Sequence, residues 1–197
     1  MMNDPHQMDV ITDQLAKRGQ SVCGDSYYYH TTDDYFICVL ADGLGSGEYA
    51  NEASSAVVNT VKENHDLDIS TIMDLSNQSL LHKRGAAVGV IKINFNTKEL
   101  AYCCTGNIRF FFYGDTEKLI YPLPTTGYLS GKRQAFKIHR FDYTKGIKFL
   151  MFSDGYPISG IKKLMNKYLS IEATAKLIKA QNMNLIDDAT FIIGSLQ

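Results

Sequence analysis

The sequence predicts an α+β domain in which layers of strands and helices pack together. About ten segments have the short apolar or alternating pattern of strands, and strands and helices come in runs rather than in alternation. A length of 197 residues with 45% hydrophobic content suits one globular domain with a core of its own. A parallel doubly wound sheet would need alternation of strands and helices. We therefore expect antiparallel sheets in a single domain over 1–197, with 1–8 as a flexible tail.

The N-terminal half is predicted to contain three strands followed by two helices. The strands are expected at 11–18, 21–30 and 35–41. The first helix is expected at 48–62, where apolar residues recur at helical spacing. The second helix should begin after an N-cap at Asp68 and continue to Lys83–Arg84, just before a glycine.

The C-terminal half is predicted to consist mainly of hairpins. An irregular segment at 123–133 is expected to form a surface flap, a kind of loop that often contacts substrate. Ser170 should cap a last helix, and an apolar strand should follow at 189–193. The expected hairpins pair 86–95 with 100–105, 108–113 with 118–121, and 135–141 with 147–152.

Composition argues against several functional classes. With 20 basic and 21 acidic residues the net charge is -1, so no basic field would hold nucleic acid or an anionic membrane, and Lys83–Arg84 is expected to be a solvated loop end. No apolar run approaches the roughly 20 residues of a membrane helix, and the N-terminus is not signal-like, so we expect a cytoplasmic protein. The cysteines lack zinc-binding spacing and should be reduced thiols: Cys23, Cys38, Cys103 and Cys104.

The most informative stretch is a glycine-rich turn between a buried strand and a helix. The apolar run 36–41 ends at Asp42, and glycines 43, 45 and 47 follow, with Ser46 as a possible helix cap. The spacing excludes two known phosphate-binding loops. The dinucleotide-binding fingerprint needs glycine at position 48, which is Glu48, and the Walker loop needs Gly-Lys beginning at the same position. Either the Asp42 carboxylate is the functional group, or this is an ordinary turn with a solvated Asp.

A second copy of the pattern favours the functional interpretation. The strand 148–153 also ends in an Asp-Gly pair, at Asp154. Asp187 stands at the start of the last strand, and in an antiparallel sheet the starts and ends of strands share an edge, so three acids can meet. Asp25, which follows Gly24, is the fourth candidate and should lie on a strand antiparallel to that of Asp42.

Clustered carboxylates predict bound cations. Such acids repel one another unless cations lie between them, and ligands that are all oxygen favour Mg²⁺ or Mn²⁺ over zinc or copper. Two such ions about 4 Å apart can hold a hydroxide and clamp phosphoryl oxygens for in-line displacement. The acids therefore indicate hydrolysis of a phosphate ester.

The joint order of motifs resembles that of PP2C-type (PPM) metal-dependent serine/threonine protein phosphatases, over nearly the whole chain. The motifs are Gly24-Asp25, Asp42-Gly43 with its glycine loop, Arg-Gly-Ala-Ala-Val-Gly-Val at 84–90, Thr-Gly-Asn at 105–107, Ser153-Asp154-Gly155 and Asp-Asp-Ala-Thr at 187–190. The resemblance implies a single domain built as a four-layer α-β-β-α sandwich, with two central antiparallel sheets flanked by helices.

The resemblance also implies the roles of the site residues. Asp42 would bridge two Mn²⁺ or Mg²⁺ ions, and the Gly43 carbonyl would bind one of them. Asp154 and Asp187 would bind the other, and Asp25 would act directly or through water. A water bridging the ions would be the nucleophile, so these four aspartates would be the catalytic residues.

Three departures from the family pattern affect what the site can do. The phosphate-gripping Arg is replaced by Gln20, with Arg18 nearby; the His of a common Asp-Gly-His-Gly motif is replaced by Leu44; and 81–87 lacks the acid of a third metal site. Two ions are therefore expected. The departures also motivate an alternative, a pseudophosphatase that binds phosphoproteins without turnover. A nucleotide-binding enzyme is a third possibility, weakened by the spacing at Glu48.

The expected substrates follow from the same resemblance. The small stand-alone form and the wording Ala-Asp-Gly-Leu-Gly-Ser-Gly-Glu-Tyr-Ala at 41–50 are similar to the phosphatases of bacterial stressosomes. This implies action on phosphoserine or phosphothreonine of stressosome STAS-domain proteins, as a negative or resetting regulator of the general stress response.

Overall fold

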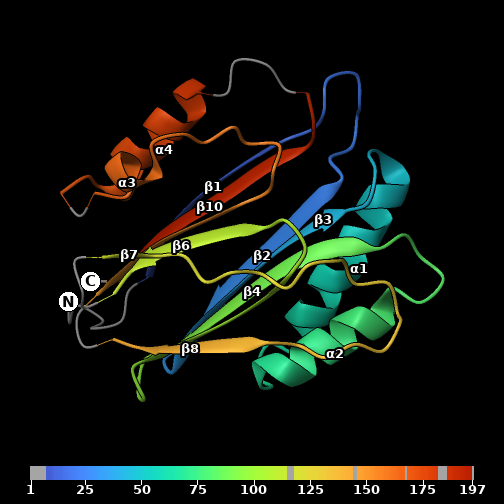
Figure 1. Cartoon of the computed structure of the whole chain (residues 1–197), viewed down its shortest axis with the longest axis horizontal. Helices are drawn as coiled ribbons and strands as arrows, with labels where there is room; N and C mark the ends of the chain where they lie inside the picture. The colour runs from blue at the N-terminus through green and yellow to red at the C-terminus, as the bar shows by residue number, and fades with distance from the viewer. Residues whose placement is uncertain (1–7, 115–117, 144–145, 167, 182–185, 197) are drawn as a thin grey trace.

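The chain forms two five-stranded antiparallel sheets that pack face to face, with helices on both outer faces (Figure 1). The computed structural model describes residues 8–114, 118–143, 146–166, 168–181 and 186–196. One sheet has the order β1-β10-β9-β6-β7 and the other has the order β2-β3-β4-β5-β8. This is the α-β-β-α sandwich that the sequence resemblance implies.

The strands of the described residues are β1 (Met8–Leu15), β2 (Asp25–Thr31), β3 (Tyr35–Gly43), β4 (Ala86–Asn94), β5 (Glu99–Thr105), β6 (Arg109–Tyr113), β7 (Leu119–Ile120), β8 (Ile138–Asp142), β9 (Ile147–Phe152) and β10 (Ala189–Leu196). The helices are α1 (Glu48–Glu63), α2 (Ile69–Ser79), α3 (Ile161–Leu164) and α4 (Ile171–Gln181). Helices α1 and α2 cover the sheet that contains β3, and α3 and α4 cover the sheet that contains β10 (Figure 1). None of these helices is long and apolar enough to cross a membrane.

The core consists of three layers of side chains, and β3 shows how one strand contributes to two of them. Phe36, Cys38 and Leu40 point between the sheets, and the residues that alternate with them pack against α1 and α2. Because both faces of β3 are fully buried, its sequence is a continuous apolar run rather than an alternating one. The prediction of a strand buried on both faces is confirmed.

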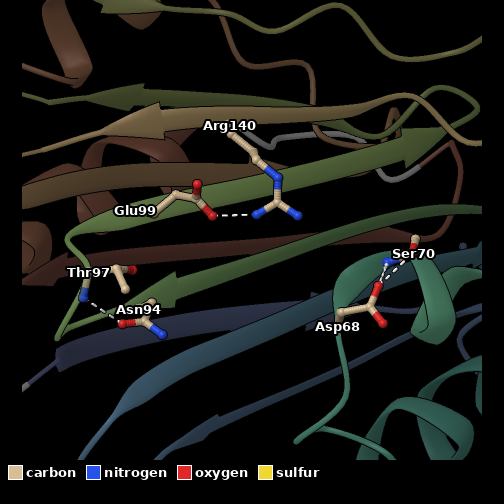
Figure 2. A network of polar contacts seen from close by, with 6 residues as sticks. All are labelled: Asp68, Ser70, Asn94, Thr97, Glu99 and Arg140. Carbon is tan, nitrogen blue, oxygen red and sulfur yellow. Dashed lines mark hydrogen bonds and ion pairs between the residues drawn. The ribbon is translucent and has the colours of Figure 1, made fainter.

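Local signals placed both helices of the N-terminal half. Helix α1 begins at Glu48 as predicted, but its N-cap is Gly47 without a side-chain cap, so Ser46 does not fill that role. Asp68 caps α2 by accepting from the backbone N–H groups of Ser70 and Thr71 at 2.9 and 3.2 Å. Figure 2 shows the Asp68–Ser70 contact. Helix α2 ends at Ser79 rather than near Arg84, because the chain turns there and His82 adopts a φ of 66°.

The predicted hairpin of 135–141 with 147–152 is wrong. Strand β8 pairs with β5, where an ion pair joins Arg140 to Glu99 (Figure 2), and β9 lies in the other sheet between β10 and β6. Strand β9 is buried on both faces and needs a partner at each edge, whereas β8 is half-exposed and suits the edge of its sheet. Residues 144–145 of the expected turn lie outside the described residues.

The other hairpins are confirmed. Strand β4 pairs with β5 through a turn in which Asn94 accepts from the Thr97 N–H at 2.8 Å (Figure 2), and β6 pairs with β7. The predicted flexible tail is too long by one residue, because Met8 is the first residue of β1 and pairs with Leu196. The remainder of that segment, 1–7, lies outside the described residues.

Candidate active site

Asp25 and Asp42 are direct partners in the register of β2 and β3. They lie where β2 begins and β3 ends. On its other edge β3 pairs with β4, with Asp42 opposite Ala87 and Gly43 opposite Ala86. Asp25 is buried, with 1% of its surface exposed, and Asp42 is partly buried. The prediction that both acids share one end of an antiparallel strand pair is confirmed.

The second sheet brings its own acids to the same place. Strands β9 and β10 are antiparallel, so the end of β9 lies beside the start of β10, and the Ser153 N–H donates to the Thr190 carbonyl at 3.0 Å. Ser153 Oγ accepts from the Thr190 N–H at 2.9 Å and donates to Asp25 Oδ2 at 2.7 Å. This serine therefore joins the Asp154 end of one sheet to the Asp25 end of the other.

The glycine after each of the two strand-terminal aspartates lies against another backbone. A Cβ on Gly43 would be 1.9 Å from the carbonyl oxygen of Ala50 in α1. A Cβ on Gly155 would be 1.9 Å from the carbonyl oxygen of Asp188. The repeated Asp-Gly pattern therefore has a packing cause, because only glycine lets the neighbouring chain approach each aspartate so closely.

The four candidate acids act on one another electrostatically. Burial raises the pKa of Asp42, and the charges of Asp25, Asp154 and Asp187 raise this pKa further. Burial also raises the pKa of Asp25, although hydrogen bonds from Ser153 and Thr190 oppose that rise. Acids from four separate segments thus share one electrostatic environment, in which a nearby cation would favour their ionised forms.

Two of these carboxylates, those of Asp154 and Asp187, have partners outside the group of acids. Asn107 Nδ2 donates to Asp154 Oδ2 at 2.7 Å, and Lys17 Nζ lies 3.7 Å from Asp187 Oδ1 in a half-exposed ion pair. In the described part of the chain, no three Asp, Glu, His or Cys side chains are gathered into a ready-made metal site. Asp25 Oδ1, however, is buried and accepts no hydrogen bond from a described group.

The donor set nevertheless fits hard divalent cations. Its oxygens come from carboxylates and from the Gly43 carbonyl, which are the ligands that Mg²⁺ and Mn²⁺ prefer. Burial first, and neighbouring acids second, raise the pKa of Asp42, and burial raises the pKa of Asp25; a bound cation would favour the ionised form of both carboxylates.

Sequence reasoning gave no role to three residues that support this site. Asp188 is buried, with 4% exposed, whereas the side chain of Asp187 is 48% exposed. Asp188 Oδ1 accepts from the backbone N–H of Lys17 at 2.8 Å, and its Oδ2 is buried without a partner among the described residues. Ser153 and Asn107 are the other two. All three residues lie inside the motifs quoted from the sequence, next to the Asp or Gly for which each motif was noted. Their position in those motifs was the signal that could have found them.

Comparisons with known proteins show the family to which this fold belongs. The family model "Stage II sporulation protein E (SpoIIE)" matches residues 32–195. The phosphoserine phosphatase RsbX of Bacillus subtilis (strain 168) is 38% identical over 195 residues, which are 99% of this chain and 98% of RsbX. A crystal structure of RsbX in complex with magnesium matches with a TM-score of 0.92 and 39% identity, over 98% of this chain and 96% of that one.

Two more distant structures share the fold. The PP2C phosphatase domain of SpoIIE from Bacillus subtilis matches with a TM-score of 0.79 and 14% identity, over 95% of this chain and 63% of that one. The catalytic domain of the phosphatase PstP with two manganese ions matches with a TM-score of 0.77 and 14% identity, over 96% and 98%. The chain therefore belongs to the SpoIIE family of PP2C-type phosphatases.

Proposed function

We propose that this protein is a metal-dependent phosphatase that hydrolyses phosphoserine or phosphothreonine in proteins. The observation that carries the proposal is that Asp25 and Asp42 are register partners in one sheet, and that Ser153, which precedes Asp154 in the other sheet, donates to Asp25 and accepts from the Thr190 N–H of β10. The influence of Asp25, Asp154 and Asp187 on the pKa of Asp42 supports the same grouping. The similarity to RsbX, a phosphoserine phosphatase, over 99% of the chain supports the same reaction class.

The proposed ligands are the residues that the sequence pattern indicates. Asp42 and the Gly43 carbonyl would hold one ion, and Asp154 and Asp187 would hold a second that Asp42 also contacts, with Asp25 acting directly or through water. When bound, two Mn²⁺ or Mg²⁺ ions would supply an activated water between them and neutralise the charge of the phosphoryl oxygens. The magnesium complex of RsbX supports this choice of metal.

The protein's own groups would orient these ligands. Ser153 fixes the rotamer of Asp25 through its 2.7 Å hydrogen bond, and Asn107 does the same for Asp154. Lys17 would balance the charge of Asp187 and, through its backbone N–H, hold Asp188 in place. Leu44, where a proton donor is common in related phosphatases, is apolar and 39% exposed. A water molecule must therefore protonate the leaving alkoxide.

The proposed substrates are phosphorylated STAS-domain proteins of a stressosome, and the proposed role is a negative or resetting regulator of the general stress response. Full-length similarity to RsbX supports this assignment. We propose a cytoplasmic protein without nucleic-acid or membrane partners, consistent with its net charge of -1.

The test is an assay of phosphate release from a phosphorylated STAS-domain protein, with Mn²⁺ and with chelator. Asp42→Asn and Asp154→Asn should abolish the Mn²⁺-dependent release and leave the far-UV circular dichroism unchanged. Asp74→Asn, an equivalent change at an exposed position of α2, is the matched control and should retain full activity. Full activity of Asp42→Asn would contradict the proposed site.

The alternative is a pseudophosphatase that binds phosphoproteins without turnover. Two observations favour it: Gln20 and Leu44 occupy positions where related phosphatases use charged or proton-donating side chains. Calorimetric titration with Mn²⁺ separates the two functions when combined with the assay. Tight Mn²⁺ binding with multiple turnovers supports the enzyme, and phosphoprotein binding with no turnover supports the alternative.

A further inference from the structure

The glycine loop after Asp42 is covered at one end by a neutral side chain. Gln20 Oε1 would lie 2.9 Å from a Cβ on Gly47, so this residue contacts the end of the loop nearest α1. Gln20 stands where related phosphatases have a phosphate-gripping arginine. Arg18 is exposed in the turn that follows β1, and it is Gln20 that contacts the loop. At this end of the loop the contact described is therefore made by a neutral amide.

The other end of the loop is covered by Arg84. The register of β3 and β4 pairs Gly43 with Ala86, and the Leu44 N–H donates to the Gly85 carbonyl at 2.8 Å. The pairing thus brings Arg84 beside Gly45, where its Nη1 would lie 2.6 Å from an added Cβ. Arg84 is consequently held beside the glycine loop that follows Asp42, with its Nη1 next to Gly45.

The guanidinium of Arg84 is oriented by an aromatic ring and a backbone carbonyl. Its central carbon lies 5.2 Å from the centroid of the Tyr49 ring, a cation–π contact, and Nη1 lies 3.4 Å from the Leu44 carbonyl oxygen. Among the described residues, no carboxylate forms an ion pair with it. Since a guanidinium has five N–H donors in a planar fork, most of them are free to bind phosphoryl oxygens in pairs.

Two lysines close to the site are engaged with acids. Lys83 Nζ lies 2.5 Å from Glu52 Oε1, and Lys17 Nζ lies 3.7 Å from Asp187 Oδ1. Lys83 is the immediate neighbour of Arg84, and of these two cations Lys83 alone forms an ion pair with a described carboxylate. Arg84 is exposed in the loop before β4, as expected for a solvated loop end, and its guanidinium in addition contacts the glycine loop and Tyr49.

We propose that Arg84 binds the phosphoryl group of the substrate, in place of the arginine absent at Gln20, and that Tyr49 is the positioning residue that holds its guanidinium. This inference rests on the proposed phosphatase function. Because the arginine approaches from the β4 side of the loop rather than from β2, the phosphate would be gripped from the opposite side of Asp42.

The first experiment measures KM and kcat for para-nitrophenyl phosphate with Mn²⁺, together with competitive inhibition by inorganic phosphate. Arg84→Ala should raise both KM and the inhibition constant by about 10- to 100-fold, the loss expected for charge-assisted hydrogen bonds. Arg84→Lys should recover part of the loss because it restores a charge but not the fork. Lys83→Ala, which removes the paired neighbour, should change either constant less than about twofold.

The small substrate separates phosphate binding from protein docking. Para-nitrophenyl phosphate presents no protein surface, so a loss confined to a phosphoprotein substrate would overturn the proposal. Wild-type KM and inhibition constants in Arg84→Ala would also overturn it. If the wild-type protein releases no phosphate at all, the proposed function fails instead. Broadening of the ³¹P resonance of inorganic phosphate then tests Arg84 separately, and equal broadening in wild type and Arg84→Ala would overturn its role.

A double-mutant cycle tests the part played by Tyr49. Tyr49→Ala should raise KM for the small substrate about two- to fivefold, the strength of an exposed cation–π contact, while kcat stays near its wild-type value. In the Arg84→Ala background the same change should have no further effect, because there is no guanidinium left to position. Equal effects of Tyr49→Ala in both backgrounds would contradict the positioning role.

Discussion

Ser153 and Asp25 link the two sheets through a 2.7 Å hydrogen bond between side chains that are both almost completely buried. Ser153→Ala should lower the free energy of unfolding by about 1–3 kcal/mol, because it leaves the Asp25 oxygen and the Thr190 N–H without a partner. Urea unfolding measures the change. Ser76→Ala is the matched control, since the buried Ser76 hydroxyl has no partner among the described residues and its loss should cost little. Equal destabilisation by both changes would contradict the proposed link.

The raised pKa of Asp42 leads us to expect that stability falls as the pH rises. Burial, and then the charges of Asp25, Asp154 and Asp187, raise the pKa of Asp42 from 3.8 to about 8. The folded chain therefore holds this proton more tightly than the unfolded chain. In chelator, the contribution of Asp42 to the free energy of unfolding should be greatest below about pH 4. That contribution should be lost as the pH rises to about 8.

Urea titrations at several pH values check this slope. Asp42→Asn should flatten the dependence and make the protein more stable than wild type near pH 8, because the amide cannot ionise. Asp74→Asn, on the exposed face of α2, should leave the slope unchanged. A wild-type slope in Asp42→Asn would show that the buried charge lies elsewhere.

Removal of the Asn107 side chain is expected to weaken metal binding without changing the fold. Its amide donates to Asp154 Oδ2 at 2.7 Å, and residues that orient metal ligands typically contribute about 10- to 100-fold to affinity. Asn107→Ala should therefore weaken Mn²⁺ binding by about tenfold in calorimetry. Asn96→Ala removes a similar exposed contact, to Asp34 Oδ1 at 2.8 Å, and should leave Mn²⁺ binding unchanged. Unaltered affinity in Asn107→Ala would mean that Asp154 needs no such support.

Substitution of Gly43 or Gly155 by a residue with a side chain is expected to cause a large loss of stability. A methyl group at either position would overlap a backbone carbonyl oxygen at 1.9 Å, and backbone atoms cannot move aside as a flexible side chain can. Gly43→Ala and Gly155→Ala should each lower the free energy of unfolding by at least about 2–3 kcal/mol. Gly114→Ala is the control, because among the described residues its added methyl would meet only the Phe112 side chain, at an ordinary 3.6 Å. A midpoint of urea unfolding near wild type in Gly43→Ala would contradict the close approach.

The parts of the fold that local sequence determines could be predicted. The apolar run of β3, the helical spacing of α1 and the Asp68 cap each act within a few residues, and the structure confirms all three. The separation of β8 and β9 into different sheets could not be predicted, because it depends on partners that lie far away in sequence. Adjacent strands with a turn between them look the same in either arrangement.

The site shows the same limit. The duplicated Asp-Gly pattern made Asp42 and Asp154 candidates, and the expected antiparallel pairing of Asp25 with Asp42 is confirmed by the strand register. The burial of Asp188 was invisible, because it depends on the Lys17 backbone and on the close approach of Gly24. The location of Arg84 could not be predicted either, because it follows from a strand register that extends from the start of β4 back into the preceding loop.

The division of the acids between two sheets has a consequence during synthesis of the chain. Asp25 and Asp42 belong to β2 and β3, whereas Asp187 precedes β10, the last strand described, which inserts between β1 and β9. A chain still emerging from the ribosome carries two of the acids long before it carries the fourth. Such a nascent chain should be inert toward phosphoproteins, and activity should arise only when the C-terminal strand completes the sandwich.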